Sequence, residues 1–474
     1  MGRSQSLNKI KIILIYSVYF RILSVIYLNF RLLNFLGLHV ATTFSQKKNG
    51  YIFANFILTR KLQYKLNLYK RLEFLAHRHH ELAEMKSSSR FHEYSEALRL
   101  QELLLVSKPL DSNRILTFFG QDLTGNIGHM SLNISLRVKM QKLFPDIYPF
   151  NHELVYGNTQ NENYLRHYSG YFNLRKVSDL EANEMQTTLW PAQESYGAFW
   201  TPQGPMNSWK ANDTYSREFD SKFPQPVLTL DDRTKEAGFE FLGKFGFTAN
   251  DWFITLHVRS ASTGPGANHR GFQYGRNADI KDYLPAIKYI TERGGWVIRI
   301  GDKGSPNPLY LPNVIDYTIQ DIQDDQLNTF FLANCEFMIG TNSGPICVPS
   351  TFGKPVVMTN CPSIARNTYF SNSIFVPKLV KNRQAKILTL EELFDSKVGY
   401  SEFWLNESKG YQWINNSSED ILNSVTEMFS RNTKDLTVGQ IRFDQICRDL
   451  GTDAIGTISN SFIELYKKEL NLTF

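Results

Sequence analysis

Short apolar runs of strand length alternate with longer amphipathic runs from residue 251 onward, and this alternation constrains the fold more than any other feature. Strands are expected at 252–258, 296–300 and 314–318, and helices at 279–292 and 324–334. Strands that alternate with helices form parallel, doubly wound sheets. We therefore predict an α/β fold whose ligands bind beyond the carboxyl ends of its strands.

The run EFMIGTNSGPICVPSTFGKPVVMTN at 336–360 predicts a strand, a turn, a short helix and a second strand. Pro345 suits the first turn of a helix, and Gly353 suits its end. The turn between strand and helix consists of Thr341, Asn342, Ser343 and Gly344. Backbone N–H groups at a helix N-terminus bind phosphate, so this turn is a candidate anion site. A well-capped turn without a ligand is the alternative for this segment taken alone.

The same rule selects residues at the ends of other strands. They are His257 and Arg259 at the end of the first strand, and Gly301 and Asp302 at the end of the second. The loop 262–277 after the first strand, with Arg276 and Asn277, could fold over a ligand bound there. Arg259 is suited to bind a diphosphate through two hydrogen bonds, and Asp302 to accept them from a base or ribose. A structural salt bridge is the ordinary role of one such arginine, but three strand ends of this chemistry favour a ligand site.

A second strand, glycine-bearing loop and helix are expected at 113–144. The loop contains Asp122, Gly125, Asn126, Gly128 and His129. Glycines let the backbone approach a ligand closely, and a neutral imidazole at the helix start can accept a proton from a hydroxyl nucleophile. The alternative is that His129 caps the helix or packs on the strand.

Residues 10–38 are apolar with an aromatic stripe at helical spacing, interrupted by Lys11, Arg21 and Arg31. We expect a helix that lies on a membrane surface. A spanning helix would place Arg21 near the middle of the bilayer, at a cost of about 2.5–3.5 kcal/mol. A helix docked on the protein itself is the third possibility. Residues 59–106 predict a helical hairpin, and 190–226 a long binding loop.

The net charge of +6 fits an anionic ligand or membrane surface and falls short of the basic stripe of a nucleic-acid-binding protein. The four cysteines show no CxxC spacing and lie mostly in apolar runs: Cys335, Cys347, Cys361 and Cys447. We expect buried thiols, with neither a zinc site nor a disulfide framework.

Three stretches carry a family resemblance: LHVRS, RNADIKDYLPAIKYITERGGWVIRIGD and FMIGTNSGPICVPSTFGKPVVMTN. Together they resemble bacterial glycosyltransferases of surface-polysaccharide loci and, more distantly, fucosyltransferases and heptosyltransferases. The resemblance spans 113–393 and implies a GT-B-like fold, in which two Rossmann-like domains face each other across a cleft, here with an N-terminal helical extension.

The resemblance also implies roles for the candidate residues. The C-terminal half would hold a nucleotide-diphosphate sugar through His257, Arg259, Arg276, Asn277, Gly301, Asp302, Thr341, Asn342, Ser343 and Gly344. The N-terminal half would hold the acceptor through Gly125, Asn126 and Gly128, with His129 as the base and Asp122 or Glu153 as alternatives. Such enzymes need neither a metal nor a further cofactor, since positive side chains stabilise the leaving phosphate.

The predicted organisation has five parts: a membrane-associating helix at 1–40, a helical hairpin at 41–108, an acceptor domain at 109–245, a nucleotide-sugar domain at 246–400, and helices at 401–474 that pack back. We expect a glycosyltransferase of surface-polysaccharide synthesis on the inner face of the cytoplasmic membrane, acting on a glycan or lipid-linked glycan. The alternatives are a non-catalytic, nucleotide-binding assembly protein and a nucleotide-sugar epimerase.

Overall fold

The computed structural model of the chain describes residues 114–119, 126–146, 148, 151–178, 198–202, 204–260, 274–321, 323–362, 364, 372–396, 398, 410–430, 436–450 and 456–472. One compact unit, Leu116–Asn183 with Ser195–Phe474, contains nearly all of them. The expected membrane helix and helical hairpin lie outside the described residues and stay predictions. Within the described part, no helix has the length and apolar character needed to cross a membrane.

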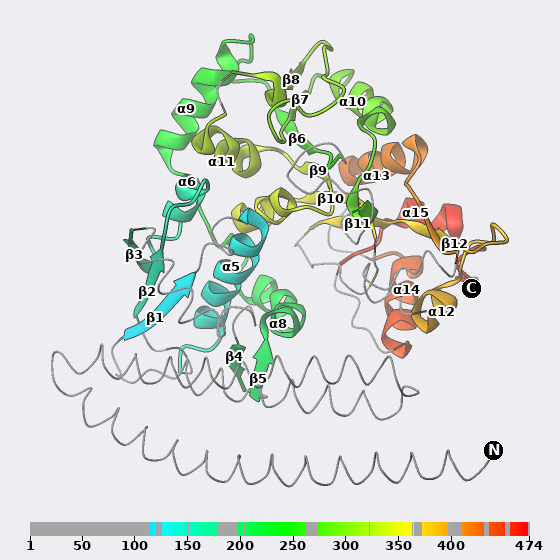
Figure 1. The fold of residues 1–474 in the computed structure, drawn as a ribbon, viewed down its shortest axis with the longest axis horizontal. Coiled ribbons are helices and arrows are strands. Elements are labelled where there is room, and N and C mark those ends of the chain that lie inside the picture. The colour runs from blue at the N-terminus through cyan, green and yellow to red at the C-terminus, as the bar shows by residue number, and fades with distance from the viewer. Residues whose placement is uncertain are drawn as a thin grey trace, which may run out of the picture. The chain divides into compact units, whose positions relative to one another are not determined.

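A six-stranded parallel sheet forms the centre of this unit (Figure 1). Its strands are β6 (Phe253–His257), β7 (Trp296–Arg299), β8 (Val314–Asp316), β9 (Met338–Thr341), β10 (Val356–Cys361) and β11 (Ile374–Pro377). They lie in the order β11-β10-β9-β6-β7-β8. Counted along the chain from β6, this order is that of the doubly wound, dinucleotide-binding Rossmann fold. The predicted parallel α/β sheet is therefore confirmed.

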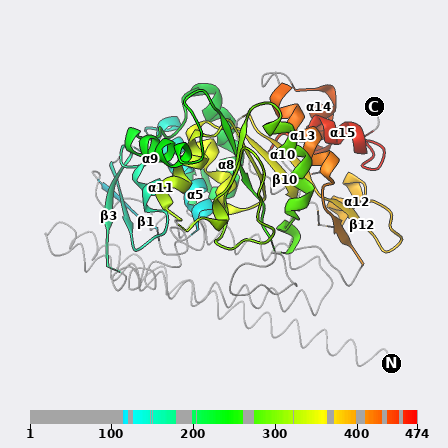
Figure 2. The ribbon, with the colours of Figure 1, turned by 90° about the horizontal axis from the view of Figure 1, so that it is seen from above.

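Helices cover both faces of this sheet (Figure 2). They are α9 (Asp232–Gly243) and α11 (Asp325–Asn334) on one face, and α10 (Leu284–Thr291), which continues the 3₁₀ turn η2 (Ile280–Tyr283), with α13 (Ser418–Ser430) on the other. Successive side chains of a strand point to opposite faces, so Phe253 packs on Phe330 of α11, at 5.7 Å between ring centroids, while Ile254 joins the core beside α10. Aromatic side chains thus supply much of the core beneath α11.

A smaller three-stranded sheet precedes the larger one. Its elements are β1 (Arg114–Phe119), α5 (Ile127–Leu143), β2 (Asn151–Tyr156), α6 (Glu162–Arg166) and β3 (Phe172–Lys176). The strand and helix expected at 113–144 are confirmed, but α5 begins before residue 130, because the Asn126 side chain accepts hydrogen bonds from the N–H groups of Gly128 and His129. The two glycines and the histidine therefore belong to the cap and first turn of α5.

The structure contradicts the long loop expected at 190–226. The described part of it contains a hairpin of β4 (Ala198–Thr201) and β5 (Gly204–Asn207), followed by α8 (Ser208–Lys222). Buried Ala211, Tyr215 and Phe219 recur at four-residue steps on α8. The many polar residues between them obscured this narrow apolar stripe. The division into an acceptor and a nucleotide-sugar domain near residue 245, just after α9, stays a prediction.

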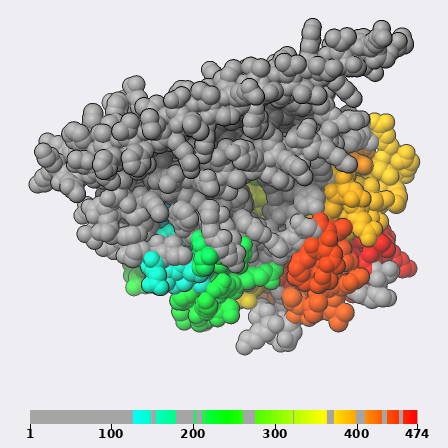
Figure 3. All heavy atoms as spheres, turned by 90° about the horizontal axis from the view of Figure 1, so that it is seen from below, coloured from blue at the N-terminus to red at the C-terminus, as the bar shows by residue number. Residues whose placement is uncertain are grey.

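The C-terminal segment adds β12 (Leu379–Lys381), α12 (Leu390–Asp395), β13 (Gln412–Ile414), α14 (Val438–Asp449) and α15 (Asn460–Tyr466). β12 and β13 pair antiparallel, and a bridge from Ile458 to Phe375 covers the edge of β11. On the face seen in Figure 3, α14 is exposed to solvent, and its Val438 is 75% accessible. The four cysteines are buried and free, as predicted.

Candidate functional site

The carboxyl ends of β6 and β9 lie side by side at the centre of the sheet. His257 pairs with Gly340, and a Cβ on Gly340 would lie 3.1 Å from the His257 carbonyl oxygen, so glycine permits this close approach. The Arg259 N–H then donates a hydrogen bond of 3.0 Å to the hydroxyl of buried Thr341. Because the strand order reverses between β6 and β9, this is the switch point where doubly wound sheets bind their ligands.

The Arg259 side chain is held at this switch point by the segment before α10. The Arg259 Nε donates a 3.2 Å hydrogen bond to Asn277 Oδ1, and the Arg259 carbonyl oxygen accepts one from the Ala278 N–H at 3.0 Å. Burial lowers the pKa of Arg259, while the nearby Asp302 acts in the opposite direction. The guanidinium still remains charged at neutral pH, since an arginine is not deprotonated in proteins. The site therefore presents an oriented cation.

His257 supplies a neutral imidazole next to this cation. Burial lowers the pKa of His257 to about 4, with smaller contributions from Arg259 and Arg299 in the same direction and from Asp302 against it. Its Nδ1 is buried and has no hydrogen-bond partner among the described residues, although the residue as a whole keeps some exposure. Unpartnered buried polar atoms are rare in native proteins. This nitrogen is therefore a candidate to bind a ligand group.

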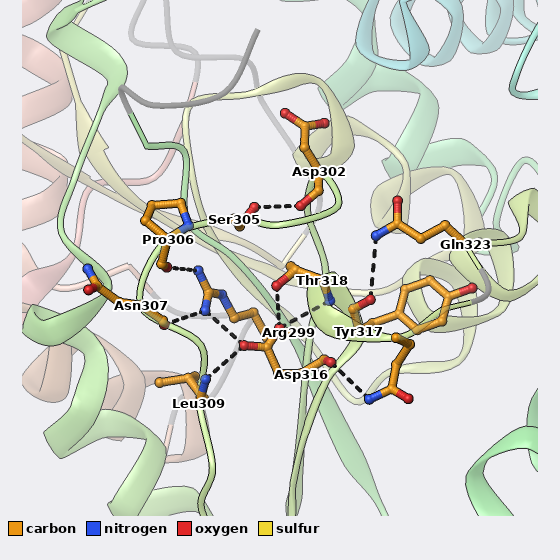
Figure 4. A network of polar contacts seen from close by, with 11 residues as sticks. Arg299, Asp302, Ser305, Pro306, Asn307, Leu309, Asp316, Tyr317, Thr318 and Gln323 are labelled. Atoms are coloured by element: carbon orange, nitrogen blue, oxygen red, sulfur yellow. Dashed lines mark hydrogen bonds and ion pairs between the residues drawn. The ribbon is translucent and has the colours of Figure 1, made fainter.

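A buried ion pair anchors the loop that carries Asp302 (Figure 4). Arg299 of β7 contacts Asp316 of β8 at 2.9 Å and donates to the carbonyl oxygens of Asn307 and Pro306 at 2.7 and 2.8 Å. The Asp302 carbonyl oxygen accepts from the Ser305 hydroxyl at 2.7 Å. These hydrogen bonds hold Gly301 and Asp302 in place after the end of β7, and the exposed Asp302 carboxylate lies near Arg259 and His257.

The start of α5 meets the turn after β9. A Cβ built on Gly128 would lie only 2.6 Å from the Gly344 Cα, so the two backbones touch. The buried Ser131 hydroxyl donates to the Cys347 carbonyl oxygen at 2.8 Å and fixes this contact. The helix turn that contains His129 is thus in direct contact with the turn after β9. Which residue acts as a base stays a prediction.

The prediction of one short helix that begins at Pro345 is wrong, because this segment forms no continuous helix. The structure has two 3₁₀ turns there, η4 (Gly344–Cys347) and η5 (Pro349–Phe352). Pro349 has no N–H, and its ring clashes with the carbonyl four residues earlier, so an α-helix cannot continue through it. Ser343 makes no side-chain cap hydrogen bond. An anion at Asn342 and Ser343 would therefore meet single N–H groups without the dipole of a long helix.

Most of the expected site residues share this edge of the sheet. The structure brings together, through direct contacts or charges, Asn126, Gly128, His257, Arg259, Asn277, Asp302, Thr341 and Gly344. Arg276, in the 3₁₀ turn η1 (Tyr274–Arg276), directly precedes Asn277. Asp122 and Gly125 lie outside the described residues, and Glu153 belongs to β2. Within the described part, no three His, Cys, Asp or Glu side chains form a group that could hold a metal ion.

Lys378 is a residue of this edge that the sequence pattern did not select. This lysine directly follows β11 at the same edge of the sheet and is buried, and its Nζ donates to the Asn277 carbonyl oxygen at 2.9 Å and to Asn415 Oδ1 at 2.7 Å. The rule that selected Arg259, a polar residue after a buried parallel strand, selects Lys378 as well once IFVP is taken as a strand of the sheet.

No protein-family model matches the chain, and no curated protein matches it in sequence. Among solved structures it is similar to a glycosyl transferase family 9 protein from Veillonella parvula, at 13% identity and a TM-score of 0.38, over 56% of this chain and 86% of that one. It is also similar to E. coli ADP-heptose LPS heptosyltransferase II, at 12% identity and a TM-score of 0.41, over 66% of this chain and 98% of that one. A third similar structure is E. coli heptosyltransferase WaaC with ADP, at 8% identity and a TM-score of 0.34, over 67% of this chain and 98% of that one.

Proposed function

We propose that the chain transfers a glycosyl group from a nucleotide-diphosphate sugar to a hydroxyl of a glycan or lipid-linked glycan. The observation that carries this proposal is the hydrogen bond between the Arg259 N–H and the Thr341 hydroxyl, which sets the arginine at the switch point of a Rossmann-ordered sheet. Nucleotides bind at such points. The sequence resemblance described above supports sugar transfer as the reaction.

In the proposed donor complex, the guanidinium of Arg259 binds the diphosphate through charge-assisted hydrogen bonds. The neutral His257 imidazole supplies one donor and one acceptor for the nucleotide, and Asp302 accepts hydrogen bonds from its ribose or base. The N–H groups of the turn 342–344 contribute further donors. These groups need no metal to stabilise a leaving diphosphate, because their charges and dipoles are already oriented.

In the proposed reaction, the acceptor oxygen forms a bond with the anomeric carbon while the bond from that carbon to the diphosphate oxygen breaks. The bonding electrons leave with the nucleotide diphosphate, whose added negative charge Arg259 stabilises. The proton of the acceptor hydroxyl goes to His129, or to Asp122 in its place. The start of α5 is the element that would bring this base to the donor, since Gly128 touches Gly344.

The cellular setting is also a proposal. The aromatic stripe at 10–38 would hold the enzyme on the inner face of the cytoplasmic membrane, where lipid-linked glycans of surface polysaccharides are assembled.

Calorimetric titration of ADP, UDP and GDP into the full chain tests the donor site. We expect one of the three to bind, and Arg259→Ala to weaken it by about 10- to 100-fold, the value of one or two charge-assisted hydrogen bonds. Arg293→Ala is the matched control, because Arg293 is exposed and stacks on Tyr289, away from the strand ends. Equal affinity in the wild type and in Arg259→Ala would remove Arg259 from the site.

Incubation with a panel of sugar nucleotides and lipid-linked acceptors tests the reaction. Release of nucleoside diphosphate together with a glycosylated acceptor is the expected result. Conversion of the donor without any acceptor would instead indicate an epimerase. Nucleotide binding with no turnover of any donor would indicate an assembly protein.

A further inference from the structure

Lys378 is a buried cation without a carboxylate partner. It follows β11, the residue is 5% exposed, and its backbone N–H donates to the Cys361 carbonyl oxygen of β10 at 2.8 Å. Its Nζ donates only to the neutral oxygens of Asn277 and Asn415. In the part of the chain that the structure describes, no Asp or Glu forms an ion pair with it. A buried charge without an opposite charge is costly, so an anionic ligand that supplies the opposite charge would be bound favourably here.

The lysine reaches the switch point through one residue. Asn277 accepts from Lys378 with its backbone oxygen at 2.9 Å and from Arg259 Nε with its side-chain oxygen at 3.2 Å. Asn277 therefore helps to orient the Arg259 guanidinium, and Lys378 fixes the backbone of Asn277. On the other side, Asn415 ties the lysine to the segment after β13.

The buried surroundings of Lys378 make its charge sensitive to a ligand. Burial lowers the pKa of Lys378 to about 8, with a small opposing effect of Cys361. Arg259 is linked to Lys378 through Asn277, and Cys361 also acts on Tyr283 of η2, whose pKa is raised mainly by burial. None of these groups is a carboxylate that would balance the charge of the ammonium in the unliganded protein.

We propose that Lys378 is a positioning residue of the nucleotide-diphosphate site, which orients Arg259 through Asn277 and whose unbalanced charge is compensated when the two phosphates bind. This inference rests on the proposed donor site, and it assigns a residue to that site that neither the sequence pattern nor the resemblance selected. The role is one of orientation and charge, because Lys378 reaches Arg259 only through Asn277.

The first test is calorimetric binding of the nucleoside diphosphate that the wild type binds best among ADP, UDP and GDP. We expect Lys378→Met and Lys378→Gln to bind it at least about tenfold more weakly, the order of one hydrogen bond to a charged group. In an Arg259→Ala background, Lys378→Met should add much less than tenfold, since residues that act through one another are not additive. Lys288→Met, at an exposed lysine, is the control and should bind like the wild type.

A second readout separates this role from simple support of the fold. At pH 8.5 we expect the wild type to take up protons on binding, because the ligand raises the pKa of the amine, and Lys378→Met to take up fewer. Cys361 and Tyr283 are present in both proteins, so the difference reports Lys378. Thermal unfolding of each variant shows that it is folded, and Lys378→Gln keeps a hydrogen-bond donor in case Lys378→Met unfolds.

The outcomes distinguish the two proposals. If the wild type binds no nucleoside diphosphate, the proposed function and this inference both fall. If the wild type binds one, but folded Lys378→Met and Lys378→Gln bind it equally well with unchanged proton uptake, only the role of Lys378 is overturned.

Discussion

Gly128, in the first turn of α5, has no room for a side chain, and Gly128→Ala tests whether its contact with Gly344 matters. A Cβ built there lies 2.6 Å from the Gly344 Cα and 3.1 Å from the Gly344 carbonyl oxygen. Both atoms belong to backbone, which cannot rotate away as a side chain can. Since ordinary contact begins at 3.4 Å, α5 and the turn after β9 have to separate by about 0.8 Å.

Two effects of Gly128→Ala on stability oppose each other. Alanine favours a helix over glycine by up to about 1 kcal/mol, whereas an extra carbon in a filled contact costs about 1–3 kcal/mol. We expect a net loss of about 1–2 kcal/mol in the free energy of unfolding. The same shift moves His129 relative to the donor residues. Because a misplacement of about 1 Å can cost about 10²-fold in rate, the transfer rate should fall at least tenfold.

Urea unfolding followed by circular dichroism measures the stability of Gly128→Ala, and initial rates at saturating donor measure its activity. The matched control is Gly170→Ala, because a Cβ on Gly170 meets nothing within 4 Å. Donor affinity should change less than the rate, since Arg259 and Asn277 lie on the other side of the contact. A Gly128→Ala protein that unfolds and reacts like the control would show that the close approach of α5 to β9 is irrelevant.

Two further predictions concern the buried charges next to the site. Arg299→Met leaves the Asp316 carboxylate buried without its partner and should lower the free energy of unfolding by about 3–5 kcal/mol. Lys288→Met, at the exposed pair with Glu292, should lower it by less than about 1 kcal/mol. Denaturant titration compares the two variants, and a similar small effect for both would contradict the role of the buried pair. The second prediction is a pH dependence of stability. The pKa of His257 falls from 6.5 to about 4 on folding, so the unfolded chain binds the proton more readily between these pH values. The contribution of His257 to stability is therefore complete above pH 6.5 and is lost as the pH falls toward 4. His257→Gln should flatten this part of the stability profile, and an unchanged slope would refute the assignment.

Local periodicity was enough to predict the elements of the larger sheet from β6 to β10, but not β11. β6, β7 and β8 each lie within two residues of their expected bounds, and β9 and β10 fall within the run 336–360, because a buried parallel strand leaves a short apolar run and the helix after it leaves an amphipathic one. The same logic selected most residues of the proposed site, since polar residues at the ends of buried strands are rarely there for packing. It failed for α8, where Ala211, Tyr215 and Phe219 form a stripe too narrow to stand out among polar neighbours.

Which strand ends become neighbours was decided only by the tertiary structure. Arg259 and Thr341 are 82 residues apart and meet because the chain crosses back to place β9 beside β6. The contacts of Gly128 with Gly344 and of Lys378 with Asn277 arise in the same way. The physical reason is range: hydrophobic period and turn chemistry act over a few residues, whereas strand order follows from how whole helices pack across the sheet.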